Sequence, residues 1–274
     1  MILRLGRWWW IAGILWWPLR GAAAPPPMLS SAPTSMTTST ATSAATPTSV
    51  TGLPLTVIPA AAGGHSPWFG VFLSGDGGWV AIDRRVADEL AKHHIPIVGW
   101  DSLKYFWSRR TPQGAAQDLD RVVLHYAQKW HRTHVLLIGF SQGADTMPFM
   151  VNRLPAATRD MVGLMALLGI SDSANFEIHV GNWLGAPPAG LPTAPELLGW
   201  SGPPYLCIYG AKDHDAACDE VTGNDGVVIK MPGGHHLRRR YAAVAAQIFS
   251  RLPTLPVVPV APVVPVALVG TSAH

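Results

Sequence analysis

Val135-Leu136-Leu137-Ile138-Gly139-Phe140-Ser141-Gln142-Gly143 is the stretch that decides the fold of this 274-residue chain. Its opening run of large aliphatic residues is typical of a strand buried on both faces. The residues from Gln142 onward are compatible with a helix. A serine between two glycines at such a junction is the pattern of a nucleophile elbow, a strained turn that presents the hydroxyl at the carboxyl end of a sheet.

Apolar runs and helical stripes alternate on both sides of this stretch. Helical spacing of apolar residues occurs around 82–91, 119–130 and 241–252. Short apolar runs predict strands at 68–73, 95–100, 135–139, 161–168, 205–209 and 227–230. This alternation, together with the elbow, predicts the α/β class. We expect an α/β-hydrolase-type, mostly parallel sheet with helices on both faces.

The N-terminus has the features of a secretory signal. Arg4 and Arg7 precede the apolar run 8–17, and Ala22-Ala23-Ala24 follows as a cleavage-like site. We therefore expect residues 1–24 to be a signal peptide that sends the chain to the periplasm. An uncleaved membrane anchor is the alternative, and it too places the domain outside the cytoplasm.

Composition divides the remainder into three parts. Residues 25–52 are rich in Pro, Ser, Thr and Ala, which favours a disordered linker. Residues 253–274 alternate Pro and Val, which favours an extended tail. Residues 53–252 hold the strand and helix patterns, and we expect them to form the α/β-hydrolase domain.

Charge and cysteine content exclude several classes of function. The formal net charge is only +3, and no basic stripe is interleaved with aromatic residues, which argues against nucleic-acid binding. No His or Cys cluster has zinc-ligand spacing, so we expect neither a metal nor another cofactor. Cys207 and Cys218 are the only cysteines, and in an exported chain they are expected to form a disulfide.

The partners that a serine nucleophile needs follow Ser141 in the order that this fold requires. Asp213 and Asp215 come after the strand at 205–209, and either can be the acid. His235 and His236 come after the next strand and a pair of glycines. We expect His235 to be the base, with His236 as the alternative.

A glycine-rich loop after the first predicted strand fits an oxyanion hole. Backbone N–H groups of Asp76 and Gly77, within the sequence 74–79, can point at a developing negative charge. The second donor is expected to be the N–H of Gln142, directly after the serine.

Several motifs together resemble the AcvB/VirJ family of bacterial virulence-associated periplasmic proteins. The resemblance covers roughly residues 66–250. It is carried by 74–79, 101–107, the elbow with Ala144-Asp145, Phe176-Glu177, and 232–236. It implies an α/β-hydrolase domain that removes lysine or alanine from aminoacyl-phosphatidylglycerol. It also implies Ser141 as nucleophile, His235 as base and, because an Asp shortly precedes a Cys in the family's acid loop, Asp215 as the leading acid.

The implied substrate suggests further contacts and partners. Asp76 or Asp101 is expected to meet the substrate ammonium group, and Trp79 and Tyr105 are candidate substrate contacts. Core packing is the favoured alternative for Tyr105. The expected partners are a membrane phospholipid substrate, through transient contact with the membrane surface, and possible secretion-system components. The rival functions are a non-catalytic periplasmic adaptor of a secretion system and an esterase of another substrate.

Overall fold

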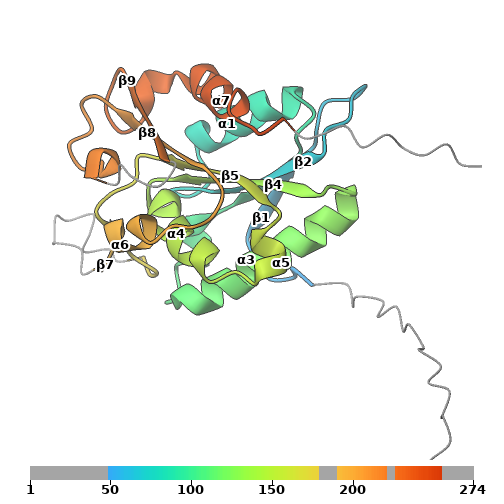
Figure 1. The fold of residues 1–274 in the computed structure, drawn as a ribbon, viewed down its shortest axis with the longest axis horizontal. Helices are drawn as coiled ribbons and strands as arrows, with labels where there is room; N and C mark the ends of the chain where they lie inside the picture. The colour runs from blue at the N-terminus through green and yellow to red at the C-terminus, as the bar shows by residue number, and fades with distance from the viewer. Residues whose placement is uncertain (1–48, 179–189, 221–225, 255–274) are drawn as a thin grey trace, which may run out of the picture. The chain divides into compact units, whose positions relative to one another are not determined.

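The computed structural model describes residues 49–178, 190–220 and 226–254 (Figure 1). The predicted signal peptide, all but the end of the predicted linker and all but the start of the predicted tail lie outside these residues. No helix within the described ranges is long and apolar enough to cross a membrane.

A seven-stranded sheet forms the centre of the domain, with strand order β1-β3-β2-β4-β5-β8-β9. All neighbouring strands are parallel except β1, which runs antiparallel to β3. The strands are β1 Leu55–Ile58, β2 Trp68–Leu73, β3 Ile97–Trp100, β4 His134–Phe140, β5 Val162–Leu168, β8 Tyr205–Gly210 and β9 Gly226–Met231. The predicted mostly parallel α/β sheet is confirmed.

Helices cover both faces of this sheet (Figure 1). α1 (Ala81–Lys92) and α7 (Tyr241–Phe249) bury their apolar residues in the hydrophobic core on one face. α3 (Pro112–Trp130) and α4 (Gln142–Asn152) do so in the core on the other face. The shorter elements are α2 Ser102–Tyr105, α5 Ala156–Arg159, β6 Ser173–Ala174, β7 Leu191–Pro192, α6 Ala194–Leu198, and the 3₁₀ turns η2 Cys218–Glu220 and η3 Leu237–Arg239.

Local signals explain where the longest helix begins and ends. Thr111 caps α3 by accepting a hydrogen bond from the Gly114 N–H at 3.0 Å, and Pro112 occupies the first turn. His131 ends the helix in the left-handed conformation, with φ 52° and ψ 49°. The apolar stripe of α3 is therefore held in register over the sheet.

The edge strand β1 was not predicted from sequence. Thr56 and Val57, its middle residues, are exposed, so the strand lacks a continuous apolar signal. It exists because Leu55 to Ile58 pair with Trp100 to Ile97 of β3. The parallel strands all end at one edge of the sheet, and the loops that follow them carry the candidate site.

Candidate active site

Ser141 sits on the strained turn expected of a nucleophile elbow. It lies between β4 and α4 with φ 51° and ψ −123°, a conformation that a non-glycine residue rarely adopts. A Cβ atom on Gly139 would lie 2.4 Å from the Gly143 carbonyl oxygen, and one on Gly143 would lie 2.3 Å from the Leu73 carbonyl oxygen. Only glycine fits at these two positions, which explains the G-x-S-x-G pattern.

His235 and Asp213 form a hydrogen-bonded pair. His235 Nδ1 lies 2.8 Å from Asp213 Oδ2, and the Asp213 side chain is only 5% exposed. An ionised carboxylate can only accept, so this contact favours the neutral tautomer with the hydrogen on Nδ1 and a lone pair on Nε2. This is the orientation that a general base needs.

The pair lies beside the elbow. The His235 ring packs against Phe140, the residue before the serine, with ring centroids 5.1 Å apart. It also lies over Gly169, where a Cβ atom would be 2.9 Å from His235 Cε1. Gly169 follows Leu168, whose carbonyl accepts the Ser141 N–H at 2.9 Å. Contacts from two neighbouring strands therefore place the imidazole next to Ser141.

The structure contradicts the preference for Asp215 as the partner of His235. Asp213, weighed as the alternative, occupies that position, while Asp215 lines a separate hollow with Asp172 and Glu220. The reason lies in the backbone of the loop. Hydrogen bonds from Asp213 N–H to Gly210 and from Lys212 N–H to Gly233 turn the loop so that Asp213 faces the histidine segment.

His236, the alternative base, has other surroundings. Its ring centroid lies 5.5 Å from that of Phe140, and it lines a hollow with Arg238 and Arg239. Within the described residues it forms no ion pair with a carboxylate. Burial, the neighbouring His235 and the Arg239 charge lower the pKa of His236, so its imidazole is neutral at pH 7. The hydrogen-bonded acid therefore distinguishes His235 from His236.

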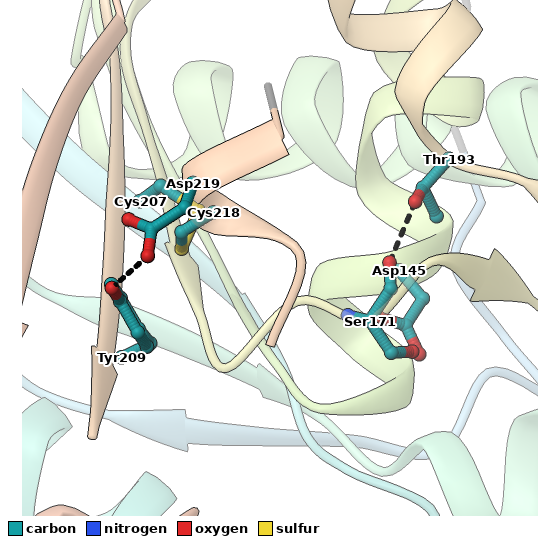
Figure 2. Close-up of a disulfide and its surroundings, with 7 residues drawn as sticks. All are labelled: Asp145, Ser171, Thr193, Cys207, Tyr209, Cys218 and Asp219. Carbon is teal, nitrogen blue, oxygen red and sulfur yellow. Dashed lines mark hydrogen bonds between the residues drawn. A yellow bond between two sulfur atoms is a disulfide. The ribbon is translucent and has the colours of Figure 1, made fainter. Parts of the chain in front are cut away.

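The predicted disulfide is confirmed. Cys207 and Cys218 are joined, with Cα atoms 5.6 Å apart (Figure 2). Cys207 lies in β8 and Cys218 begins η2, so the bridge closes the loop that carries Asp213. Tyr209 donates a hydrogen bond of 2.5 Å to Asp219 across the same loop, and Figure 2 marks it with a dashed line.

The glycine-rich loop after β2 meets Ser141 through Gly75. A Cβ atom on Gly75 would lie 3.2 Å from Ser141 Cβ, whereas one on Gly77 would meet no atom within 4 Å. Asp76 follows directly after Gly75, the residue of this loop that packs against Ser141. Gln142 is the first residue of α4, where backbone N–H groups have no partner within the helix.

Three predicted substrate contacts have structural roles. Tyr105 is 1% exposed and donates to Asp118 at 2.6 Å, which favours core packing, the preferred alternative for this residue. The Trp79 ring packs edge-on against Phe72, with centroids 5.5 Å apart. Asp101 caps α2 by accepting from the Lys104 N–H, and it also forms an ion pair with the Lys104 ammonium.

Sequence reasoning assigned no role to Asp145, a buried carboxyl near the elbow. It accepts a hydrogen bond from the Ser171 N–H at 2.7 Å (Figure 2 shows both residues). Burial raises its pKa to about 7, and the negative charges of Asp76 and Asp172 add to this effect. In the sequence it stood out only as part of the elbow motif with Ala144, four residues after Ser141.

The described residues offer no site for a metal ion. No group of three or more His, Cys, Asp or Glu side chains within 49–178, 190–220 and 226–254 is arranged to bind one.

Solved structures share this fold at low sequence identity. Est1E from Butyrivibrio proteoclasticus, bound to ferulic acid, has 15% identity and a TM-score of 0.52 over 74% of this chain and 96% of that chain. The esterase domain of a Rhodothermus marinus protein has 11% identity and a TM-score of 0.51 over 72% and 90%. MenH from S. aureus has 12% identity and a TM-score of 0.51 over 72% and 97%. These similarities show that the domain has the α/β-hydrolase fold.

Sequence comparison identifies the family. No curated protein matches the chain. The family model described as bacterial virulence protein (VirJ) matches residues 68–255, which include the elbow, the Asp213 loop and the histidine segment. The chain belongs to the VirJ family of bacterial virulence proteins.

Proposed function

We propose that this chain is a serine hydrolase of carboxylic esters, with Ser141 as nucleophile, His235 as base and Asp213 as the acid that orients the base. The observation that carries the proposal is the His235–Asp213 pair, 2.8 Å apart, packed beside a strained serine. A serine hydroxyl is a weak nucleophile until an adjacent base removes its proton.

The first half of the reaction follows from these positions. His235 Nε2 accepts the Ser141 hydroxyl proton as Oγ attacks the ester carbonyl carbon. The carbonyl π electrons move to oxygen, and the N–H groups of Gln142 and Asp76 are the proposed donors to that oxyanion. Asp213 stabilises the imidazolium through Nδ1–H without taking its proton.

Collapse of this intermediate completes the cycle. The C–O bond to the leaving alcohol breaks, and His235 donates its proton to the departing oxygen. A water then attacks the acyl-Ser141 ester, with His235 again accepting a proton. The products are a carboxylic acid and an alcohol, and Ser141 regains its hydrogen.

The proposed substrate is the aminoacyl ester of lysyl- or alanyl-phosphatidylglycerol. Membership of the VirJ family and the motif resemblance support this choice. A hollow of about 480 Å³ lined by Asp172, Asp215 and Glu220 also fits, because carboxylates attract the ammonium group of an aminoacyl ester. Asp215 thereby takes a substrate-binding role in place of the expected role as acid.

The proposed location is the periplasm. The Cys207–Cys218 disulfide supports it, because such bonds persist in oxidising compartments. The predicted signal at residues 1–24 supports it as well.

The test compares the purified full-length chain with Ser141→Ala on vesicles that contain lysyl-phosphatidylglycerol. Free lysine is quantified over time. We expect the variant to lose about 10⁴-fold or more in rate. Ser250→Ala is the matched control, since its exposed hydroxyl lies at the C-terminal end of α7, where it donates to the Gln247 carbonyl and accepts from Arg251. Lysine release by Ser141→Ala at the wild-type rate would refute the proposal.

A non-catalytic adaptor of a secretion system is the second candidate, favoured by the family's description as virulence proteins. Its discriminating experiment is complementation of a deletion strain with Ser141→Ala. An adaptor restores the phenotype without the nucleophile, whereas the hydrolase account requires that it fails.

A further inference from the structure

A second hollow, of about 840 Å³, lies between the start of α1 and the segment after the histidines. Four of its lining residues carry nitrogen side chains: Arg85, His236, Arg238 and Arg239. Val80, Ala81 and Tyr241 add apolar wall. We refer to it as the basic hollow. Its size is within the range of ligand sites.

Within the part of the chain that the structure describes, the arginine charges of the basic hollow have no acidic partner. Among the described residues, no carboxylate lies within ion-pair distance of Arg85, Arg238 or Arg239. Asp83, the acidic residue in the first turn of α1, is buried and accepts the Val80 N–H at 2.8 Å. Three unpaired guanidinium groups around an open hollow attract a multivalent or phosphate-type anion.

The backbone holds two of these arginines in a strained arrangement. Leu237, Arg238 and Arg239 all have positive φ, between 48° and 57°, which non-glycine residues avoid. Leu237 is 1% exposed and anchors the run in the core. The Arg238 stem crosses Gly233 so closely that a Cβ atom there would lie 2.4 Å from Arg238 Cγ. The backbone that carries Arg238 and Arg239 is therefore anchored by Leu237, while both side chains remain exposed.

The basic hollow adjoins the catalytic residues along the chain on both sides. Val80, which lines the hollow, ends the loop that begins at Gly75, and Gly75 packs against Ser141. His236, on the other side of the hollow, directly follows His235. The His235 and His236 rings lie 5.8 Å apart. A ligand group held there lies beside the segment that carries His235.

We propose that the basic hollow binds the phosphodiester group of a glycerophospholipid, with Arg85, Arg238 and Arg239 meeting the phosphate and the apolar wall meeting the adjoining glycerol and acyl carbons. The inference rests on the proposed ester hydrolase activity for the identity of the lipid. The charge and the cavity are independent of that activity.

The experiment measures binding in a chain that cannot turn over. Full-length Ser141→Ala is titrated with phosphatidylcholine vesicles that contain phosphatidylglycerol. The titration is repeated with a Ser141→Ala chain that also carries Arg238→Gln and Arg239→Gln. Each arginine near an anionic surface contributes about 1 kcal/mol, so we expect affinity to fall about thirtyfold. Arg238→Lys/Arg239→Lys retains both positive charges, which attract an anionic surface about equally, and is expected to stay within about threefold of the parent. Thermal unfolding of each variant checks that the fold is intact.

Two further measurements test whether binding depends on the basic hollow rather than on general surface charge, and whether the ligand is a lipid headgroup rather than free phosphate. Arg109→Gln/Lys92→Gln removes two exposed charges elsewhere and should leave vesicle binding unchanged. Glycerophosphoglycerol, the deacylated headgroup, should compete with the vesicles, and inorganic phosphate at equal concentration should compete less. Equal loss in the control pair, or unchanged binding in Arg238→Gln/Arg239→Gln, overturns the proposal. Because this experiment measures no turnover, either of these outcomes leaves the hydrolase proposal intact. Conversely, if the wild-type chain releases no lysine but binds the vesicles as expected, the lipid-binding proposal remains intact.

Discussion

At the scale of single residues, the central feature is the choice between two aspartates two positions apart. The sequence places Asp213 and Asp215 on one loop, and nothing in their spacing tells which side chain faces the histidine. The backbone hydrogen bonds between the loop and Gly210 and Gly233 decide it. Such long-range bonds have no local signal, so the acid could be predicted only as a pair of alternatives.

Asp213→Asn should reduce kcat far more than Asp215→Asn. An amide at position 213 can stabilise the wrong tautomer of His235, a change that costs about 10⁴-fold in a known triad. The measurement is kcat with a neutral soluble ester such as p-nitrophenyl acetate. If Asp215→Asn loses as much as Asp213→Asn, the assignment of the acid is wrong.

Asp145 gives stability an unusual pH dependence. Its pKa rises from 3.8 in the unfolded chain to about 7 in the folded one because of burial. Between these values the folded protein holds a proton that the unfolded chain has released, so this group's contribution to stability falls as pH rises from about 4 to about 7.

Asp145→Asn should therefore gain stability relative to wild type as pH increases. Asparagine keeps an acceptor for the Ser171 N–H and does not ionise. We expect the difference in unfolding free energy to shift by up to about 3 kcal/mol between pH 5 and pH 8, measured by urea denaturation. A difference that stays constant with pH would show that Asp145 is ionised throughout.

At the scale of elements, the sequence predicted the elbow and most strands because their signals are local. Periodicity located β2, β4, β5, β8 and β9 to within about two residues at each end, and the flanking glycines located the turn at Ser141. β1 could not be predicted, because its stability comes from pairing with β3 rather than from an apolar run.

The elbow glycines can be tested against a glycine that makes no contact. A Cβ atom at Gly143 would overlap the Leu73 carbonyl, whereas one at Gly77 meets nothing within 4 Å. We expect Gly143→Ala to destabilise the fold by more than about 3 kcal/mol and Gly77→Ala to change it by less than about 1 kcal/mol. Urea unfolding measures both, and similar values for the two variants would contradict the packing described for the elbow.

The disulfide stabilises the element that carries the acid. It links residues 11 positions apart, and closing a loop of that length contributes about 3 kcal/mol in the chain-entropy model. Cys207→Ala/Cys218→Ala should lower the unfolding free energy by roughly that amount. It should also slow ester hydrolysis, because Asp213 is then held less firmly. Unchanged stability and rate would show that the loop is fixed without the bridge.

At the scale of the whole molecule, the sheet collects loops from six strands at one edge. The elbow, the Gly75 loop and the Asp213–His235 pair meet there because parallel strands end together. Their order along the chain predicted this gathering. The two hollows beside them could not be predicted, since Arg85, Arg238 and Arg239 come from segments that only the fold brings together.

The two hollows at the active-site edge carry side chains of opposite charge. Carboxylates line the hollow that includes Asp215, and guanidinium groups line the basic hollow. An aminoacyl ester of an anionic lipid carries an ammonium group and a phosphate on either side of the scissile bond. The arrangement of charge therefore agrees with the proposed substrate.

Labelling by a fluorophosphonate probe tests the central claim most directly, because the probe reacts only with a serine that a neighbouring base activates. The full-length chain is labelled and digested, and the adduct is located by mass spectrometry, with Ser141→Ala and Ser250→Ala in parallel. We predict one adduct on Ser141, unchanged in Ser250→Ala and absent in Ser141→Ala. A folded wild-type chain that takes up no probe, or a Ser141→Ala chain that is labelled equally, would contradict the assignment of Ser141 as an activated nucleophile.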